Sequence, residues 1–335
     1  MDIVSPVPKA STGGRNTSDD PIRVLYISGT GRIGSTILCR ALGEQPHFHP
    51  LGEAIDLWKF GVLENCRCSC GSLFHDCQFW QDVADSAPGL FDRTAASRFA
   101  ALADTLFRTR ELPRLWTPWT RSRIADDLLP EYLLAISRLY EAIRTVSGAR
   151  VIIDGSKSPM YGYLLSLVGN LDVTTVQMVR DPRAVAFSLQ RKVRDPGHAE
   201  SPYLPRYRPL VVAAVWMMSY LSQEIVNRLN SSREHLLRYE DFVSDPTATT
   251  RWLVELAGEA YLGSGPGAER QADLSPVHMV NGNPNRFVSG TVPITLDDEW
   301  KKALPTAQRR VVTTMTFPFL TRYGYLDRSA RRCLT

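Results

Sequence analysis

The chain has 335 residues, enough for one large domain or two modest ones, and for a substantial core without disulfide staples. Hydrophobic residues make up 44% and charged residues 22%, an ordinary globular mix that excludes collagen-like and low-complexity classes. The 39 basic and 35 acidic residues leave a formal net charge of +4 at pH 7, which gives no basic coat for nucleic acid.

The two ends of the chain differ in composition from the region between them. Residues 1–21 are rich in Ser, Gly, Pro and charge and lack an apolar core, so we expect a disordered leader and not a secretory signal. We expect one domain over residues 22–326 and a tail over 327–335. No run of eighteen apolar residues exists, so no membrane span is expected, and we predict a soluble, cytoplasmic protein.

Apolar, β-branched segments alternate with helical ones along the chain. The predicted strands are residues 23–28, 151–154, 173–179 and 234–239. The predicted helices are residues 36–42, most of 84–146, 183–191 and 210–229. Strands that alternate with helices indicate an α/β fold with a parallel sheet. We therefore predict a central parallel β-sheet flanked by helices, in a single domain with helical insertions.

A glycine-rich loop, residues 29–36 (GTGRIGST), joins the first predicted strand to the first predicted helix. Backbone N–H groups at a helix N-terminus form an anion site. The loop opens with a glycine, and Gly34 and Thr36 also fit the phosphate loop of nucleotide hydrolases, but Ser35 stands where that loop carries its lysine. Since that lysine reaches the β- and γ-phosphates of ATP, its absence argues against NTP hydrolysis. Arg32 brings a positive charge from a different point of the loop.

A second anion pattern follows the third predicted strand. Arg180 directly ends that strand, and Ser188 lies eight residues later on the next predicted helix. Arginine offers a fork of charge-assisted donors, and a serine on the first turns of a helix adds a hydroxyl beside the helix dipole. At this spacing the pair predicts a phosphate site.

Together these patterns resemble the sulfotransferases that use 3′-phosphoadenosine 5′-phosphosulfate (PAPS). In that family the 5′-phosphosulfate loop reads Lys/Arg-x-Gly-Ser/Thr-Thr/Ser, which Arg32 to Thr36 match, with Ile33 where serine is common. The family also grips the 3′-phosphate with an arginine and a serine spaced like Arg180 and Ser188. Further segments also resemble those of bacterial members: 51–53, 68–80, 154–157, 238–241, 282–287 and 323–325. The resemblance therefore covers about residues 23–325.

The resemblance implies a P-loop-like fold, PAPS as the sulfuryl donor, and a set of cofactor-binding residues: Arg32, Gly34, Ser35, Thr36, Arg180, Ser188 and Arg286. Arg286 looks like the C-terminal segment that closes over the 3′-phosphate. Sulfuryl transfer resembles phosphoryl transfer through a loose transition state, so catalysis is mostly in-line positioning and charge neutralisation. No metal is required, and we assign no metal ligand.

Three residues are the predicted catalytic groups. Arg32 should contact the bridging and sulfuryl oxygens. Lys157 follows the second predicted strand and resembles the lysine that tyrosylprotein sulfotransferases place on the leaving group. Glu53 lies where those enzymes carry their catalytic glutamate, and we predict it as the base that accepts the acceptor's proton. Cytosolic steroid and phenol sulfotransferases instead use a histidine after the second strand, where this sequence reads GSK over residues 155–157 and has none. His47 and His49, near the end of the first predicted helix, are fallback bases.

Four cysteines cluster as Cys66-x-Cys68-x-Cys70-x6-Cys77. Zinc sites normally use C-x2-4-C pairs, so this spacing is wrong for two such pairs, although His75 lies nearby. Metal binding, a local disulfide and simply packed thiols all stay open.

We therefore predict a sulfotransferase that moves the sulfuryl group of PAPS to a hydroxyl of a small-molecule acceptor. The alternatives are a P-loop kinase or other NTP-dependent enzyme, and a non-catalytic nucleotide- or zinc-binding protein. The acceptor itself is not readable, because variable loops such as 109–123 and 195–209 choose it. Four tryptophans are candidates to line an aromatic acceptor site, with packing in the core as the alternative for each: Trp58, Trp80, Trp116 and Trp119.

Overall fold

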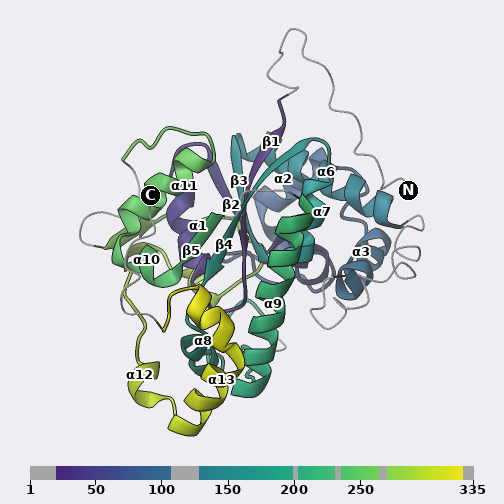
Figure 1. Ribbon diagram of the computed structural model, residues 1–335. Coiled ribbons are helices and arrows are strands. Elements are labelled where there is room, and N and C mark those ends of the chain that lie inside the picture. The colour runs from purple at the N-terminus through teal and green to yellow at the C-terminus, as the bar shows by residue number, and fades with distance from the viewer. Residues whose placement is uncertain (1–19, 107–127, 199–202, 231–234, 264–269, 327–335) are drawn as a thin grey trace.

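The computed structural model describes residues 20–106, 128–198, 203–230, 235–263 and 270–326. Its centre is a five-stranded, wholly parallel sheet in the order β2-β3-β1-β4-β5 (Figure 1). The strands are β1 (Ile22–Ser28), β2 (Phe48–Gly52), β3 (Val151–Lys157), β4 (Leu171–Val179) and β5 (His235–Arg238). The predicted α/β fold with a central parallel sheet is confirmed.

Four of these strands were predicted from apolar runs, but β2 was not. Its sequence, FHPLG, carries Pro50, which has no N–H to give to a ladder. The sheet accommodates it because β2 is an edge strand, paired on one side only with β3.

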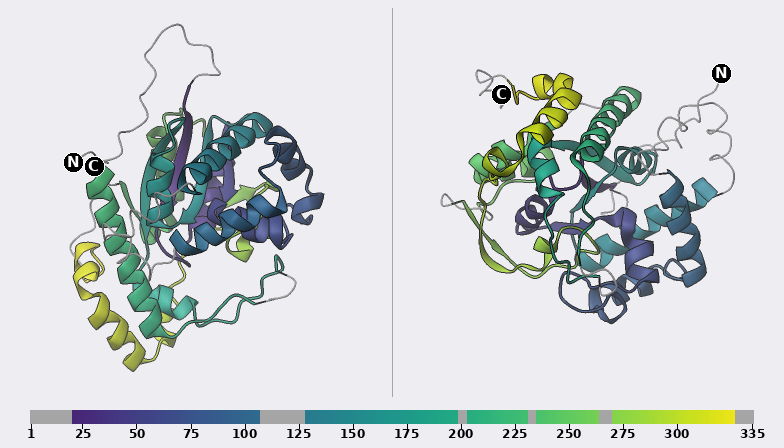
Figure 2. Two further views of the ribbon diagram at one scale, coloured as in Figure 1. Left: turned by 90° about the vertical axis from the view of Figure 1, so that its right-hand side faces the viewer. Right: turned by 90° about the horizontal axis from the view of Figure 1, so that it is seen from below.

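Helices cover both faces of the sheet (Figure 2). Alternate residues of β1 point to opposite sides. Val24 and Tyr26 face one core, which four helices cover: α2 (Gln78–Ser86), α3 (Arg93–Leu106), α6 (Leu128–Ser147) and α7 (Pro159–Ser166). Leu25 and Ile27 face the other core, which is covered by α1 (Ser35–Gly43), α9 (Pro209–Asn230), α10 (Tyr239–Ser244), α11 (Pro246–Leu256) and α13 (Thr306–Arg322). The predicted helical stretch 84–146 is realised as α3 and α6, with residues 107–127 outside the described part.

Helices α9 and α13 lie side by side and project together beyond the sheet (Figures 1 and 2). Trp216 and Tyr220 of α9 pack against Tyr323, which follows α13, with ring centroids 6.1 and 5.6 Å away. By length and composition alone, the stretch Pro209–Arg228 is apolar enough to cross a membrane, and 44% of its most apolar window is buried inside the protein. A core helix of a soluble protein passes the same test.

Short elements complete the fold around the carboxyl ends of the strands. An antiparallel pair, β6 (Gln271–Leu274) and β7 (Gly290–Pro293), was not predicted, since four-residue strands leave little periodicity to read. The remaining helices among the described residues are α8 (Pro182–Ser188), α12 (Trp300–Ala303), η1 (Ala54–Asp56), η2 (Leu57–Leu63), η3 (Phe74–Asp76) and η5 (Pro284–Phe287).

Candidate functional site

The glycine loop lies between β1 and α1, at the carboxyl edge of the sheet where the strand order reverses. Open parallel sheets bind their ligands at this place. The loop is fixed at its start, because the N–H of Gly29 donates to the carbonyl of Lys157 (2.9 Å) and its carbonyl accepts from the Ser219 hydroxyl (2.9 Å). Gly34 has φ +90°, and a Cβ there would lie 2.6 Å from the ring of Tyr239. The loop therefore needs glycine at this position.

Three positively charged residues of the predicted site, Arg32, Lys157 and Arg180, lie at this edge of the sheet. Strands β3 and β4 flank β1, so Lys157 at the end of β3 and Arg180 just after β4 lie on either side of the loop that carries Arg32. The guanidinium of Arg180 donates from Nη1 to the carbonyl of Arg32 (2.9 Å) and lies 4.3 Å above the ring of Tyr239. The structure thus brings the two separate sequence motifs into direct contact.

Like charges crowd around Arg32. Burial is the main cause that lowers the pKa of its guanidinium, and the neighbouring charges of Arg180 and Arg191 lower it further, while Asp195 opposes them. Crowded cations of this kind are stabilised by a bound anion. The electrostatics of the loop therefore favour a negatively charged ligand.

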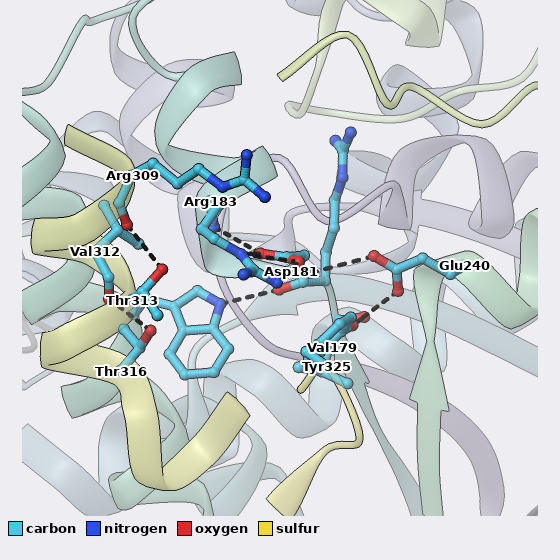
Figure 3. A network of polar contacts seen from close by, with 11 residues as sticks. Val179, Asp181, Arg183, Glu240, Arg309, Val312, Thr313, Thr316 and Tyr325 are labelled. Carbon is cyan, nitrogen blue, oxygen red and sulfur yellow. Dashed lines mark hydrogen bonds and ion pairs between the residues drawn. The ribbon is translucent and has the colours of Figure 1, made fainter. Parts of the chain in front are cut away.

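A polar network holds the corner that carries Arg180 (Figure 3). The backbone N–H of Asp181 donates to Glu240 (3.3 Å), and the hydroxyl of Tyr325 donates to the same carboxylate (2.7 Å). The side chain of Arg183 donates three further bonds to the carboxylate of Asp181, which also caps the start of α8. The segments around Glu240 and Tyr325, which resemble family segments, thus support the β4–α8 corner.

Two donor groups of Arg180 are already engaged by the protein, and one is not. Besides its bond to the loop, Nη2 donates to the carbonyl and the carboxylate of Asp297 (3.0 and 3.1 Å). The Nε–H is buried and has no partner among the described residues, which is the state expected of a donor that serves a ligand. Ser188 is half-buried and is the last residue of α8, not an early one, so the helix dipole does not help it hold an anion.

The predicted base and the predicted leaving-group lysine form an ion pair. Lys157 Nζ donates to Glu53 Oε1 and to the carbonyl of Gly155 (3.1 Å), and the two charged side chains are only 14% and 20% exposed. A Cβ placed on Gly282 would lie 3.4 Å from Glu53 Oε1 and 3.5 Å from Thr36 Oγ1. Glu53 and Lys157 therefore lie close to Thr36, where the anion loop ends and α1 begins.

A buried carboxylate fixes the strand end that carries Lys157. Asp154 accepts bonds from the Ser156 N–H (2.8 Å) and from the Tyr140 hydroxyl, and burial raises its pKa to about 6. Ser156 in turn accepts from the N–H of Ile55, just beyond Glu53 (3.1 Å). This chain of contacts ties the ends of β2 and β3 together and so positions the ion pair.

A second acid lies beside Glu53 and was missed in the sequence. Burial, and next the charge of Glu53, raise the pKa of Asp56 to about 7, and Asn281 Nδ2 donates to its carboxylate (2.7 Å). No motif marks Asp56, because its environment depends on a segment more than two hundred residues away in the chain. Its raised pKa makes Asp56 a group able to exchange a proton near neutral pH.

The two fallback histidines do not share this location. His47 precedes β2 at the amino end of the sheet, where its carbonyl accepts from Val151 (3.1 Å). His49 is packed against Phe79, and burial lowers its pKa to about 4. The strand direction thus separates both from the anion loop, which lies at the carboxyl end.

Of the two alternatives for the tryptophans, acceptor lining and core packing, the structure shows core packing for two of the four. Trp58 and Trp80 are 0% and 1% exposed and pack in the core beneath α2, α3 and α6. Their buried apolar rings stabilise the fold. Trp116 and Trp119 lie outside the described residues.

Arg286 is buried below the surface of the site. Its guanidinium donates to the carbonyl of Gly282 and pairs with Asp195 (3.4 Å), whose other oxygen accepts from His198 (2.9 Å). Burial lowers the pKa of Arg286, and Asp195 opposes this. The structure therefore links Arg286 to the 195–198 segment, a contact that no sequence pattern indicates.

The sequence matches no protein-family model and no curated protein. Solved structures do resemble the chain. The sulfotransferase domain of the Synechococcus PCC 7002 olefin synthase is 19% identical over 92% of this chain and 98% of its own, with a TM-score of 0.48. The domain from the curacin biosynthetic pathway is 20% identical over 88% and 98%, with a TM-score of 0.43. The Alicyclobacillus acidocaldarius sulfotransferase is 13% identical over 90% and 94%, with a TM-score of 0.42.

Proposed function

We propose that this protein is a PAPS-dependent sulfotransferase that acts on a hydroxyl of a small-molecule acceptor in the cytoplasm. The observation that carries the proposal is that the anion loop and the Glu53–Lys157 pair lie together at one edge of the sheet. The loop lacks the lysine that the phosphate loop of nucleotide hydrolases carries. The loop offers a place for the phosphosulfate, and the pair offers a base and an acid beside it.

The donor would lie across the loop. The N–H groups of Gly34, Ser35 and Thr36 at the start of α1 would hold the 5′-phosphosulfate, and Arg32 would neutralise its sulfuryl oxygens. Arg180 would hold the 3′-phosphate, which its buried, unpartnered Nε–H supports. Ser188 and Arg286 are the further 3′-phosphate ligands of this proposal.

The ion pair would divide the chemistry of transfer. Glu53 takes the proton of the acceptor hydroxyl while the oxygen of that hydroxyl forms a bond to sulfur. At the same time the bond from sulfur to the bridging phosphate oxygen breaks. Lys157 stabilises the negative charge that develops on that leaving oxygen. Because the charges are balanced by Arg32 and Lys157, the step as proposed requires no metal ion.

The test is calorimetric binding of adenosine 3′,5′-bisphosphate and of ATP, each with and without magnesium. We expect tight, magnesium-independent binding of the bisphosphate. Arg180→Ala should weaken it roughly 10- to 100-fold, because the one charge-assisted hydrogen bond from its unpartnered Nε–H would contribute about 1.5–3 kcal/mol. Ser188→Ala should cost less, since it removes one neutral donor.

Arg23→Ala is the matched control, because Arg23 lies at the amino end of β1 and bonds to the carbonyl of Ala257 (2.9 Å), far from the loop. It removes the same charge and should leave the affinity unchanged. Unchanged binding in both Arg180→Ala and Ser188→Ala would refute the cofactor assignment. Preference for ATP with magnesium would make this a kinase-like enzyme.

A further inference from the structure

Four potential metal ligands converge outside the proposed transfer site. They are Cys68, Cys70, Cys77 and His278, and their sulfur and nitrogen atoms all lie within 4.8 Å of one another. All five cysteines in the described part of the chain are free thiols, so the local disulfide left open by the sequence is not formed there. Cys333 lies outside those residues.

The spacing of the donor atoms suits a tetrahedral zinc ion. Zinc–sulfur bonds of about 2.3 Å and zinc–nitrogen bonds of about 2.0 Å imply donor separations of about 3.5–3.8 Å at tetrahedral angles. Sγ of Cys70 lies 3.7 Å from Sγ of Cys77. Nδ1 of His278 lies 3.8 Å from the sulfur of Cys68 and 3.2 Å from that of Cys77.

The backbone around the cysteines presents them to one point. Cys68 and Cys70 lie in a tight turn, in which the N–H of Cys68 donates to Ser72 (3.0 Å) and that of Gly71 donates back to Cys68 (2.9 Å). Cys77 follows η3 and directly precedes α2. The C-x-C spacing does not suit two zinc-binding pairs. Here it supplies two ligands of a set whose fourth member lies elsewhere in the chain.

That fourth member is His278, and the sequence did not reveal it. It lies between β6 and η5, about two hundred residues after the cysteines. Its ring stacks on Phe79 at a centroid distance of 4.9 Å and an angle of 9°, which fixes its orientation. His75, the histidine nearest in sequence, instead has Nε2 at 3.0 Å from the carbonyl of Val62.

We propose that Cys68, Cys70, Cys77 and His278 bind one structural zinc ion. Three thiolates and one imidazole form a closed set of a type used in structural zinc sites. Cys68 and Cys77 are 0% and 1% exposed, so their sulfurs are shielded from solvent. Four protein ligands leave no open position for substrate, which separates this site from catalysis.

The zinc ion would join the cysteine loop to the segment that borders the transfer site. Ser69 already exchanges bonds with Met279, since its N–H donates to the Met279 carbonyl (3.1 Å) and its hydroxyl accepts from the Met279 N–H (2.7 Å). Two residues beyond Met279, the side chain of Asn281 donates to Asp56, and the N–H of Asn283 donates to the hydroxyl of Thr36 (3.3 Å). The metal would thus stabilise the position of residues 278–283 against the anion loop.

The first test is the metal content of the purified full-length protein, which does not depend on whether it transfers sulfuryl groups. We expect about one zinc ion per chain in the wild type, and substoichiometric zinc in Cys77→Ser and His278→Ala. Cys66→Ser is the matched control, because it removes a thiol of the same loop that does not belong to the set. It should retain the metal.

A second measurement keeps the proposal testable if the ligand variants do not fold. Wild-type protein stripped of metal under reducing conditions and reloaded with cobalt(II) should show the intense visible absorption of tetrahedral thiolate coordination. Absence of zinc from the wild type together with no such cobalt spectrum would overturn the proposal. So would a Cys70–Cys77 disulfide in the native protein, or full zinc retention in His278→Ala.

Discussion

The Glu53–Lys157 ion pair gives the sharpest test of the site, because its strength can be measured without knowing the acceptor. We consider Glu53→Gln, Lys157→Met and the double variant. Each single change removes one charge and nearly conserves the volume of the side chain. Each leaves its partner charged in a place where little solvent reaches it, since the two side chains are 20% and 14% exposed.

The expected magnitude follows from this burial. Breaking a fully buried ion pair costs about 3–5 kcal/mol, whereas an exposed pair contributes about 0–1 kcal/mol. For a mostly buried pair we expect each single variant to lower the free energy of unfolding by about 2 kcal/mol. The double variant should lose less than the sum, because it leaves no unpaired charge, so the coupling energy should be about 1–2 kcal/mol.

The assay is urea denaturation of the four proteins at pH 7.5. The pair Lys301–Asp298 serves as the control cycle, since it joins the same kinds of charge at 3.1 Å but its side chains are 54% and 55% exposed. Its coupling energy should stay below about 0.5 kcal/mol. Strict additivity at Glu53 and Lys157, or equal coupling in the two cycles, would refute the buried pair.

The same variants separate structure from catalysis. If Glu53 is the base, Glu53→Gln should keep adenosine bisphosphate binding and lose turnover of PAPS by roughly 10²–10⁴-fold. The Asp56 pKa gives an independent reading, because the charge of Glu53 raises it and that of Lys157 lowers it. It should therefore fall in Glu53→Gln and rise in Lys157→Met. Full activity in Glu53→Gln would show that another group is the base.

Two further substitutions test the loop and the second acid. Gly34→Ala should abolish bisphosphate binding measured by calorimetry, because its Cβ would meet the Tyr239 ring at φ +90°, whereas Gly31→Ala, with no atom within 4 Å, should bind normally. Asp56 has its pKa raised from 3.8 to about 7, so the folded state keeps a proton that the unfolded chain loses and stability falls as pH rises between these values. Asp56→Asn should therefore stabilise by roughly 2 kcal/mol more at pH 8 than at pH 5 in urea denaturation, and an equal effect at both pH values would contradict this.

Local patterns in the sequence determined the elements that build the site. The apolar run ending at Ser28 and the glycines after it gave a buried strand, a turn and a helix, because these preferences depend on neighbouring residues alone. The residues that follow the strands, Lys157 and Arg180, were also predicted from the sequence. That they lie on either side of the loop depends on the strand order, which places β3 and β4 beside β1.

Tertiary packing decided what no local pattern encodes. The strand β2 contains a proline and exists because β3 offers it an edge. His278 reaches the cysteine loop, and Asn281 reaches Asp56, across about two hundred residues. The sequence left Trp58 open between the core and an acceptor site, and only the packing of the folded chain shows that it lies in the core. The physical reason is range: propensity and periodicity act over a few residues, whereas ion pairing, pKa and metal coordination depend on distances between segments that only the folded chain brings together.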